Sequence, residues 1–511
     1  MVRPSTERDG AARLFFVDSL LVTVAAFVCF IPGLGAEGFR NWDEGLYCAA
    51  TREMLREGHL LYAIHDGLFD AYYGKPPLIN WLHMLSVKVF GFTPFAFRLP
   101  SAFAAAMSVF FVHQIASRHL GRAAGAFAGL LLLLSLPYAE LGRQSLIEPL
   151  LGLFALVALG AHLHAMRPDG MRWAVVSGLA IAASILAKQV VGALPLCAIV
   201  LTEAVLRRPK ALTRLALAGG IGLLVSGLWF SAVYVRVGPL LFESFVGDHL
   251  IGRVSGVFEQ HGRRAIDYGQ ELELNLYHLP IIVAILGAVK LVIQRETRPL
   301  GLLFGSYACF HYLVFGVLSR NFLPWYLYAA IPSAAIFAGG LFGKGSGFEL
   351  RALILGALSA SVAYFLRVDP IPSALFGVFL ALLYEPLSIR RYAPSLTLFI
   401  ALALVLGPLK PRPTEPLPRA FLEAVDREDA LLLLANRYQF TYQCHLPEVE
   451  VRVVGDGCVG IHRIVRTESP NDLILAPGLS VCELHQRGYS LRVRQDGYRL
   501  YSKRQAEAQR Q

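Results

Sequence analysis

Charged residues are scarce in this chain, and that scarcity excludes an ordinary soluble protein. Lys, Arg, Asp and Glu make up 16% of the 511 residues, whereas 55% are apolar. The mean hydropathy is +0.52. Soluble domains carry closer to about a quarter charged residues. The composition therefore indicates a membrane protein.

Several sequence motifs are also missing. The seven cysteines form no Cys-x-x-Cys pair, which argues against a common zinc or redox motif. Neither a Walker A loop nor a dinucleotide-binding glycine fingerprint occurs in strand–helix context. No Asp-x-Asp motif accompanies the polar clusters described below. These absences argue against a nucleotide pocket. Cys29, Cys197 and Cys309 lie in apolar runs, where small core residues are expected.

Long apolar segments dominate the first four-fifths of the chain. A bilayer span needs about 20 apolar residues, or fewer where flanking side chains reach the interface. We expect an all-α polytopic membrane protein with about thirteen transmembrane helices. The segment 78–90 is shorter and carries Lys88, so it is placed along the interface. The predicted spans are 14–35, 97–117, 121–138, 146–166, 173–188, 190–206, 213–235, 278–294, 301–318, 323–342, 350–366, 371–386 and 394–409.

Positive charge tests this arrangement. A chain that starts in the cytoplasm as an uncleaved anchor places alternate loops inside, and each of these carries at least two basic residues, as the positive-inside rule requires. This explains the net charge of +10 without nucleic acid. The outer side then receives loops 36–96, 139–145 and 236–277 and the C-terminal tail. The inside pairs and clusters are Arg118 and Arg122; Arg167 and Arg172; Arg207, Arg208, Lys210 and Arg214; Arg295 and Arg298; Lys344 and Arg351; Arg390 and Arg391.

The C-terminal part differs in composition. Residues 1–410 form the predicted transmembrane domain, the proline-rich residues 411–418 a linker, and residues 419–511 a polar domain. Period-two alternation in 449–453 and 489–493 is typical of strands with one buried face. We predict a small α+β domain outside the cytoplasm. One disulfide is expected there among Cys444, Cys458 and Cys482, and the sequence does not choose the pair.

The first outer loop holds the densest group of polar residues. Asp43 and Glu44 open a segment in which apolar residues recur at helical spacing, which predicts an amphipathic helix in the interface. Asp43 is a candidate general base, which would remove a proton from an acceptor hydroxyl, with Glu44 beside it. The alternative is that Asp43 only caps the helix. Lys75 precedes two prolines, which hold the chain extended. It is a candidate contact for a lipid-linked phosphate, or else an ordinary interfacial lysine.

Further polar residues lie at predicted outer ends of spans. Arg143 and Glu148 either pair with each other or meet phosphate and a sugar or cation, respectively. Lys188 is another phosphate candidate. His249 and Arg253 are one turn apart if their segment is helical, so both can face one ligand. Tyr326 is either a phosphate donor or an aromatic belt residue.

In the order and spacing of these motifs the chain resembles the polytopic C-type glycosyltransferases. It is most similar to the branch with the undecaprenyl-phosphate aminoarabinose–lipid A transferases and the bacterial relatives of protein mannosyltransferases. The resemblance covers residues from about 40 to 335. It rests on these motifs: Asp43-Glu44-x-x-Tyr47, Arg52-Glu53-Met54, Lys75-Pro76-Pro77-Leu78 with Trp81, Arg98-Leu99-Pro100-Ser101, Gly142-Arg143 with Glu148, Ala187-Lys188, Asp248-His249 with Arg253, and Tyr326 with Pro332.

The resemblance implies transfer of a sugar from a polyprenyl-phosphate carrier on the outer face of a bacterial inner membrane, with or without a divalent metal ion. The acceptor would be lipid A or another glycan, and protein is less favoured. The resemblance matches Asp43 to the family's first-loop aspartate, and Lys75, Arg143, His249 and Tyr326 to its carrier-phosphate contacts. With the residues' own chemistry, the candidate catalytic pair is Asp43 and Glu44. Lys188 and Arg253 join the candidate donor-phosphate contacts, and the candidate sugar or metal contacts are Glu148, Asp70 and Tyr73.

Two positions depart from the family pattern. The family usually has Glu before Lys-Pro-Pro, where this chain has Gly74, and Asp70 could substitute for it. The family commonly has Asp where this chain has Glu148. The donor sugar is therefore left open by the sequence.

Two other classes of function are weighed against an enzyme. A transporter or lipid flippase favours polar residues near mid-bilayer in broken helices, whereas the polar residues here gather at one membrane edge. A scaffold that acts through residues 419–511 would tolerate changes at Asp43 and Lys75.

Overall fold

The computed structural model describes thirteen stretches of the chain, most of them in its first two thirds. The chain divides into two compact units. The first comprises Met1–Leu34, Phe69–Leu82 and Arg98–Lys410, and the second comprises Gly35–Leu68, His83–Phe97 and Pro411–Gln511. The described residues are 5–36, 38–39, 43–65, 68–71, 73–209, 211–255, 275–319, 323–341, 430–434, 450–453, 472–475, 489–495 and 498–503.

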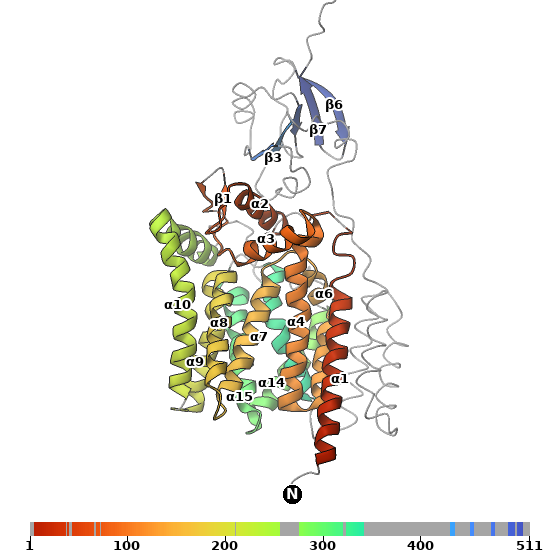
Figure 1. Ribbon diagram of the computed structural model, residues 1–511, viewed down its shortest axis with the longest axis vertical. Helices are drawn as coiled ribbons and strands as arrows, with labels where there is room; N and C mark the ends of the chain where they lie inside the picture. The colour runs from red at the N-terminus through yellow and green to blue at the C-terminus, as the bar shows by residue number, and fades with distance from the viewer. Residues whose placement is uncertain are drawn as a thin grey trace, which may run out of the picture. The chain divides into compact units, whose positions relative to one another are not determined.

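Helices form almost all of the described part of the first unit, and Figure 1 shows the longer ones running side by side. Leucine- and alanine-rich runs satisfy their backbone groups internally as helices, which an apolar environment requires. In chain order they are α1 (Ser5–Phe30), α4 (Pro94–Leu120), α5 (Arg122–Leu134), α6 (Leu136–Gly142), α7 (Glu148–Ala165), α8 (Met171–Lys188), α9 (Leu194–Leu206), α10 (Ala211–Val237), α11 (Leu240–Phe242), α12 (Arg253–Ser255), α14 (Asn275–Ile293), α15 (Arg298–Tyr312) and α16 (Ile331–Leu341).

Non-α helical turns interrupt the described residues of this unit at four places. Two are 3₁₀ segments, η1 (Gln189–Ala193) after α8 and η4 (Pro324–Ala330) before α16. Two are π-helical, η2 (Glu243–Gly252) and η3 (Leu313–Leu318). Segments of both kinds are frequent at functional sites. All four contain or adjoin residues discussed below.

Close helix packing depends on small residues. Helix α8 packs against both α7 and α10. A Cβ at Gly178 of α8 would lie 2.7 Å from the carbonyl oxygen of Ala218, and one at Gly222 of α10 would lie 2.7 Å from Ile181. The missing side chains therefore let the two backbones approach, as in other membrane helix pairs.

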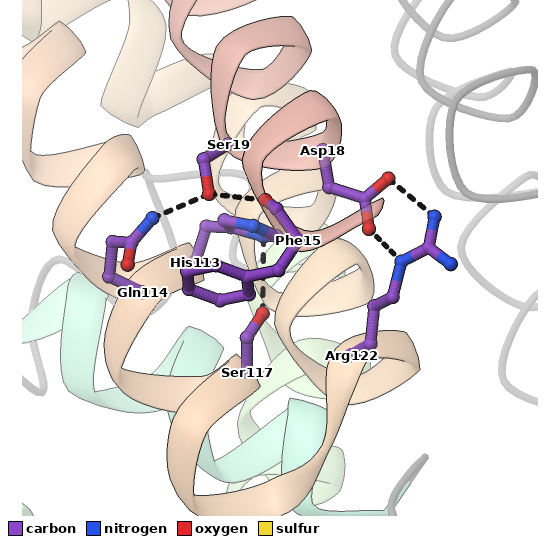
Figure 2. A network of polar contacts seen from close by, with 7 residues as sticks. All are labelled: Phe15, Asp18, Ser19, His113, Gln114, Ser117 and Arg122. Atoms are coloured by element: carbon purple, nitrogen blue, oxygen red, sulfur yellow. Dashed lines mark hydrogen bonds and ion pairs between the residues drawn. The ribbon is translucent and has the colours of Figure 1, made fainter. Parts of the chain in front are cut away.

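A polar network joins α1 to α4 and α5 (Figure 2). Asp18, which is 3% exposed, pairs with Arg122 through both carboxylate oxygens. Ser19 donates to the Phe15 carbonyl at 2.8 Å and accepts from Gln114 Nε2 at 2.6 Å. Because Asp18 and Ser19 each bond a residue of a neighbouring helix, the network fixes the position of α1 along the bundle.

The described residues of the second unit include much of the first outer loop of the sequence analysis and the C-terminal strands given below. Its part of the loop contains α2 (Asp43–Arg56), β1 (Ile64–His65), and parts of β2 (Leu68–Phe69) and α3 (Leu78–Phe90). Helix α2 has acidic residues in its first turn and Arg56 in its last, which suits the helix dipole. Phe39, Cys48 and Phe97 form a buried cluster in this unit. Cys48 is disulfide-bonded, which the sequence analysis did not anticipate.

His83 is a fully buried member of the same unit. Its Nδ1 lies 3.2 Å from Thr51 Oγ1, and its ring packs 4.8 Å from that of Phe97. Burial lowers the pKa of His83 to about 3, although a hydrogen bond to the Phe97 backbone opposes the shift. The imidazole is therefore neutral at physiological pH.

Five strands are described near the C-terminus: β3 (Ala430–Leu434), β4 (Glu450–Val453), β5 (Asp472–Leu475), β6 (Tyr489–Gln495) and β7 (Tyr498–Lys503). They form one sheet in the order β4-β3-β5-β7-β6. β3 pairs in parallel with β4 and β5, whereas β7 pairs antiparallel with β5 and β6. The two strands expected from alternation are thus confirmed as β4 and β6.

Most predicted helices are confirmed. Ten of the thirteen predicted spans coincide with described helical segments, and the segment 78–90 is the helix α3. Its place along the interface stays a prediction. Five helical stretches of the described chain are long and apolar enough to cross a bilayer: Pro94–Leu120, Glu148–Ala165, Met171–Leu206, Ala211–Val237 and Arg298–Leu318. The chain is therefore an integral membrane protein. The predicted spans 350–366, 371–386 and 394–409, the linker 411–418, and Cys444, Cys458 and Cys482 lie outside the described residues.

One prediction about the cysteines was wrong. Cys29 is buried as expected, but Cys197 of α9 and Cys309 of α15 are exposed at the protein surface. An apolar run in a membrane protein can face lipid as well as the core, so hydropathy alone does not place a residue inside.

Candidate functional site

The loop between β2 and α3 has a defined conformation. Asp70 is 8% exposed, and its Oδ1 accepts a hydrogen bond from the backbone N–H of Tyr73 at 3.1 Å. The Tyr73 hydroxyl donates to Asn80 Oδ1 of α3 at 2.8 Å. Both predicted sugar or metal contacts in this loop therefore also hold its shape. A buried Asp that binds a nearby backbone N–H is a common turn device.

Gly74 and Lys75 follow directly. Gly74 has φ +47°, a conformation that residues with a Cβ rarely adopt. The Lys75 ammonium lies 5.7 Å from the centroid of the Tyr73 ring, within range of a cation–π contact. Lys75 is half-buried, whereas Pro76 and Pro77 are buried. The two prolines thus anchor the segment after the lysine.

The π-helix η2 lies against this loop. Ser244 Oγ donates to the Ala71 carbonyl at 2.6 Å across 173 residues of sequence. The imidazole of His249 occupies the space that a side chain at position 74 would need, since a Cβ there would overlap it. The structure thus brings together His249 and the residue next to Lys75, as the sequence analysis expected of a shared ligand site. Arg253 begins α12, and its side chain lies outside the described residues.

Lys188 ends α8 in a buried ion pair. Its Nζ lies 2.6 Å from Oε1 of Glu148, the first residue of α7, and the two side chains are 9% and 0% exposed. The same ammonium lies 4.3 Å from the Tyr326 ring centroid and 5.1 Å from that of Phe315. Of the alternatives for Tyr326, burial at 3% exposure disfavours a lipid-facing belt residue.

Some buried polar atoms of α7 and α15 have no hydrogen-bond partner among the described residues. Within the described part of the chain, Glu148 Oε2, His311 Nδ1 and the Tyr307 hydroxyl are buried and have no hydrogen-bond partner. His311 donates through Nε2 to the Tyr326 carbonyl, 3.1 Å away. Buried polar atoms of this kind usually meet a partner such as a water or a ligand.

Gln189 is a site residue that the sequence analysis missed. It directly follows Lys188, and its Nε2 donates a hydrogen bond to the Gly74 carbonyl. Its backbone has φ 38° and ψ −130°, which is unusual for a residue with a side chain. Its only sequence signal is its position next to Lys188, because no propensity marks a glutamine for this conformation.

Arg143 contacts the end of α1. Its guanidinium donates to the carbonyls of Cys29, Phe30 and Pro32 at 2.9, 3.2 and 2.6 Å, respectively. These carbonyls lie at and just beyond the end of α1, where backbone acceptors lack helical partners. Arg143 therefore caps α1. Its contact with a phosphate stays a prediction.

Asp43 and Glu44 belong to the second unit. They form the first turn of α2, as predicted, where Asp43 is half-buried and Glu44 is 2% exposed. Their role as the catalytic pair of the same site stays a prediction. As for a metal, no group of three or more His, Cys, Asp or Glu side chains in the described ranges is placed to hold an ion.

Basic groups gather around the loop. Lys75, Lys188 and His249 belong to this cluster, and Lys188 is paired with Glu148. Lys75 follows Gly74 and the His249 ring lies against it, so both are candidate contacts for a phosphate.

Comparisons with known proteins bear on the fold of the chain. The family described as dolichyl-phosphate-mannose-protein mannosyltransferase matches residues 74–231, a stretch from Gly74 into α10. Among solved structures, ArnT from Cupriavidus metallidurans in the apo state superposes with a TM-score of 0.70 at 19% identity, covering 97% of this chain and 98% of that one. The chain has the fold of ArnT. The same protein bound to undecaprenyl phosphate gives a TM-score of 0.68.

Curated relatives give a similar picture. An undecaprenyl phosphate-alpha-4-amino-4-deoxy-L-arabinose arabinosyl transferase of Sodalis glossinidius is 27% identical over 359 residues. That match covers 68% of this chain, and an uncharacterized protein of Aquifex aeolicus matches 62% of it at 22% identity. The chain spans only 61% and 62% of the length of these two relatives, respectively. The predicted resemblance to C-type glycosyltransferases is confirmed.

Proposed function

We propose that the chain is an integral-membrane glycosyltransferase that moves a sugar from a polyprenyl-phosphate carrier to a lipid or glycan acceptor such as lipid A. The observation that carries this proposal is the likeness of almost the whole chain to ArnT. ArnT has been solved with undecaprenyl phosphate bound, which supports the same class of carrier here. Membrane lipids complete the set of partners, and no nucleic acid is among them.

The roles of the residues follow from their chemistry. Lys75 and His249 neutralise the carrier phosphate, the leaving group, with Arg253, Tyr326 and Arg143 as further candidate contacts. Asp43 takes the proton of the acceptor hydroxyl as that oxygen attacks the anomeric carbon, and the sugar–phosphate bond breaks with its electron pair on the phosphate. Glu44 assists Asp43, and the ion pair between Lys188 and Glu148 stabilises the structure around the site. Asp70 and Tyr73 fix the loop, and each remains a candidate sugar contact.

The topology also belongs to this proposal. Thirteen transmembrane helices in the bacterial inner membrane would place the N-terminus in the cytoplasm and the site on the periplasmic side, together with an α+β domain over 419–511. The distribution of arginine and lysine between loops supports this orientation.

Mass spectrometry of envelope lipids and glycans tests the proposal. Cells without the gene should lose one sugar increment from one acceptor, and a plasmid copy should restore it. Copies with Asp43→Asn or Lys75→Ala should not restore it, although their protein reaches the membrane. The alternative function, a transporter or flippase, predicts a different pair of results. The envelope glycans would be unchanged, and vesicles that contain the purified chain would take up a lipid or solute.

A further inference from the structure

Gln189 has a backbone conformation that a glycine would adopt more easily. Its φ of 38° is one of only two positive values at non-glycine residues in the described ranges, the other being 52° at Arg207. Lys188 before it is also irregular, with φ −147° and ψ 61°. The chain leaves the α-helix here and enters η1. Strain of this kind persists where the surrounding structure requires it, often at functional sites.

The side chain of Gln189 shows what the strain achieves. Its Nε2 donates to the carbonyl oxygen of Gly74, 115 residues away. A carbonyl oxygen and the next backbone nitrogen lie in one rigid peptide plane. The hydrogen bond to Gly74 therefore sets the orientation of the peptide that carries Lys75.

A second element holds the same peptide. The His249 imidazole fills the volume beside the Gly74 Cα, where a side chain would otherwise lie. Gln189 from the end of α8 and His249 from η2 thus contact one residue, which is fixed in the left-handed region. Few degrees of freedom remain for the backbone of Lys75.

We infer that Gln189 is a positioning residue for the carrier phosphate: it ties the end of α8, with its Lys188–Glu148 pair, to the peptide of Lys75, so that the Lys75 ammonium and the His249 ring face one anion. This inference rests on the proposed function. It adds a residue that contacts no substrate and acts through Gly74. A purely structural glutamine would only end α8.

Binding of undecaprenyl monophosphate to the purified full chain in nanodiscs separates these roles. Gln189→Gly removes the hydrogen bond to the Gly74 carbonyl and, at the same time, relieves the backbone strain at position 189. We expect the thermal unfolding temperature to stay level or rise, because glycine accepts the positive φ. We expect the Kd to rise roughly tenfold, the effect of losing one hydrogen bond of ordinary strength. Loss of binding without loss of stability is a result that a structural role does not give.

Arg207→Gly is the matched control. This change relieves the backbone strain at the other non-glycine residue with a positive φ, which is exposed. It should leave the Kd for undecaprenyl monophosphate unchanged. If Gln189→Gly does not fold, Gln189→Asn replaces it, since asparagine tolerates positive φ and is one methylene too short to keep the same hydrogen bond. Its Kd should rise likewise.

Two failures are distinguishable. If the wild-type chain binds undecaprenyl monophosphate and the folded Gln189 variant binds it equally well, the positioning role is overturned. If the wild-type chain itself does not bind undecaprenyl monophosphate, the proposed function fails first.

Discussion

Nζ of Lys188 lies 2.6 Å from Oε1 of Glu148, and both side chains are buried. The carboxylate already balances the charge of this lysine inside the protein, so Lys188 offers less attraction to a phosphate than an unbalanced ammonium. The pair also joins the last residue of α8 to the first residue of α7. We therefore assign it mainly to the support of the site.

Breaking this pair should destabilise the fold. Lys188→Met or Glu148→Gln leaves one buried group without its charge partner, which costs about 3–5 kcal/mol in comparable pairs. The free energy of unfolding in detergent measures this. The double variant should recover part of the loss. The exposed pair Arg56–Glu57, with N···O 3.1 Å, is the control, and Glu57→Gln there should cost under about 1 kcal/mol. Equal losses at the two sites would contradict the support role.

Lys75 is expected to contribute directly to carrier affinity. Lys75→Ala removes a charged contact worth about 1.5–3 kcal/mol, which raises the Kd for undecaprenyl monophosphate roughly 10- to 150-fold. The Kd of the variant should also depend less on salt, because one charge is lost. Lys88→Ala, at an exposed lysine near the end of α3, should leave the Kd unchanged. A Lys75 variant that binds like the wild type would exclude this contact.

The role of Asp43 as a catalytic base can be tested separately from a role as the residue that caps α2. Asparagine and serine cap helices about as well as aspartate, but neither accepts a proton as a base. Asp43→Asn and Asp43→Ser should therefore fold and bind undecaprenyl monophosphate normally, while the transfer rate falls by about 10²–10⁴-fold. Retained transfer in both variants would leave Asp43 as a cap alone. Glu57→Gln, at an exposed acid just beyond the same helix, is the control for loss of a carboxylate.

The helices could be predicted from the sequence because hydropathy and helix length act locally. The segment 78–90 is an example: its bounds match α3, and its short length already set it apart from the spans. The start of α2 at Asp43 was also predicted, because acidic residues favour a helix N-terminus. Cys197 and Cys309 show the limit of this reasoning, since a hydropathy pattern does not distinguish lipid from core.

The site could be predicted only in part, because its contacts join residues far apart in sequence. Lys75 and His249 were both selected, yet no pattern indicated that the His249 ring would lie on Gly74. The sequence analysis left Arg143 with either Glu148 or a phosphate and gave no sign of its contacts with the end of α1. Gln189 was missed because its role depends on a strained backbone and on a partner 115 residues away.

His83 predicts a pH dependence of stability. Burial lowers the pKa of its imidazole from 6.5 to about 3, so between these values the unfolded chain holds one more proton than the folded chain. Stability contributed by the neutral ring is thus present above pH 6.5 and is lost as the pH falls toward 3. His83→Asn cannot take up that proton. Its unfolding free energy should decline less steeply between pH 6 and 4, by up to about 1.4 kcal/mol per pH unit. Leu85→Gln, an exposed change on the same helix, should keep the wild-type slope. Identical slopes for His83→Asn and the wild type would show that His83 does not titrate in this way.

Gly74 gives the sharpest test of the loop, because the chain contains a matched glycine. Gly74 and Gly91 both have positive φ, at +47° and +74°. A Cβ at Gly91 would meet no atom within 4 Å, whereas one at Gly74 would overlap the His249 ring. Gly91→Ala should therefore lower the free energy of unfolding only by the cost of a positive φ at alanine, about 1–2 kcal/mol. Gly74→Ala should cost that amount and, in addition, displace His249.

The displaced ring provides the second measurement. If His249 and Lys75 face one phosphate, Gly74→Ala should weaken the binding of undecaprenyl monophosphate at least about tenfold, as expected for one lost polar contact. Adding His249→Ala to Gly74→Ala removes the overlap, so stability should return toward that of Gly91→Ala. Binding should stay weak, because the imidazole is now absent. Recovery of both stability and binding in the double variant would show that His249 only fills space, and Lys75 would then hold the phosphate without it.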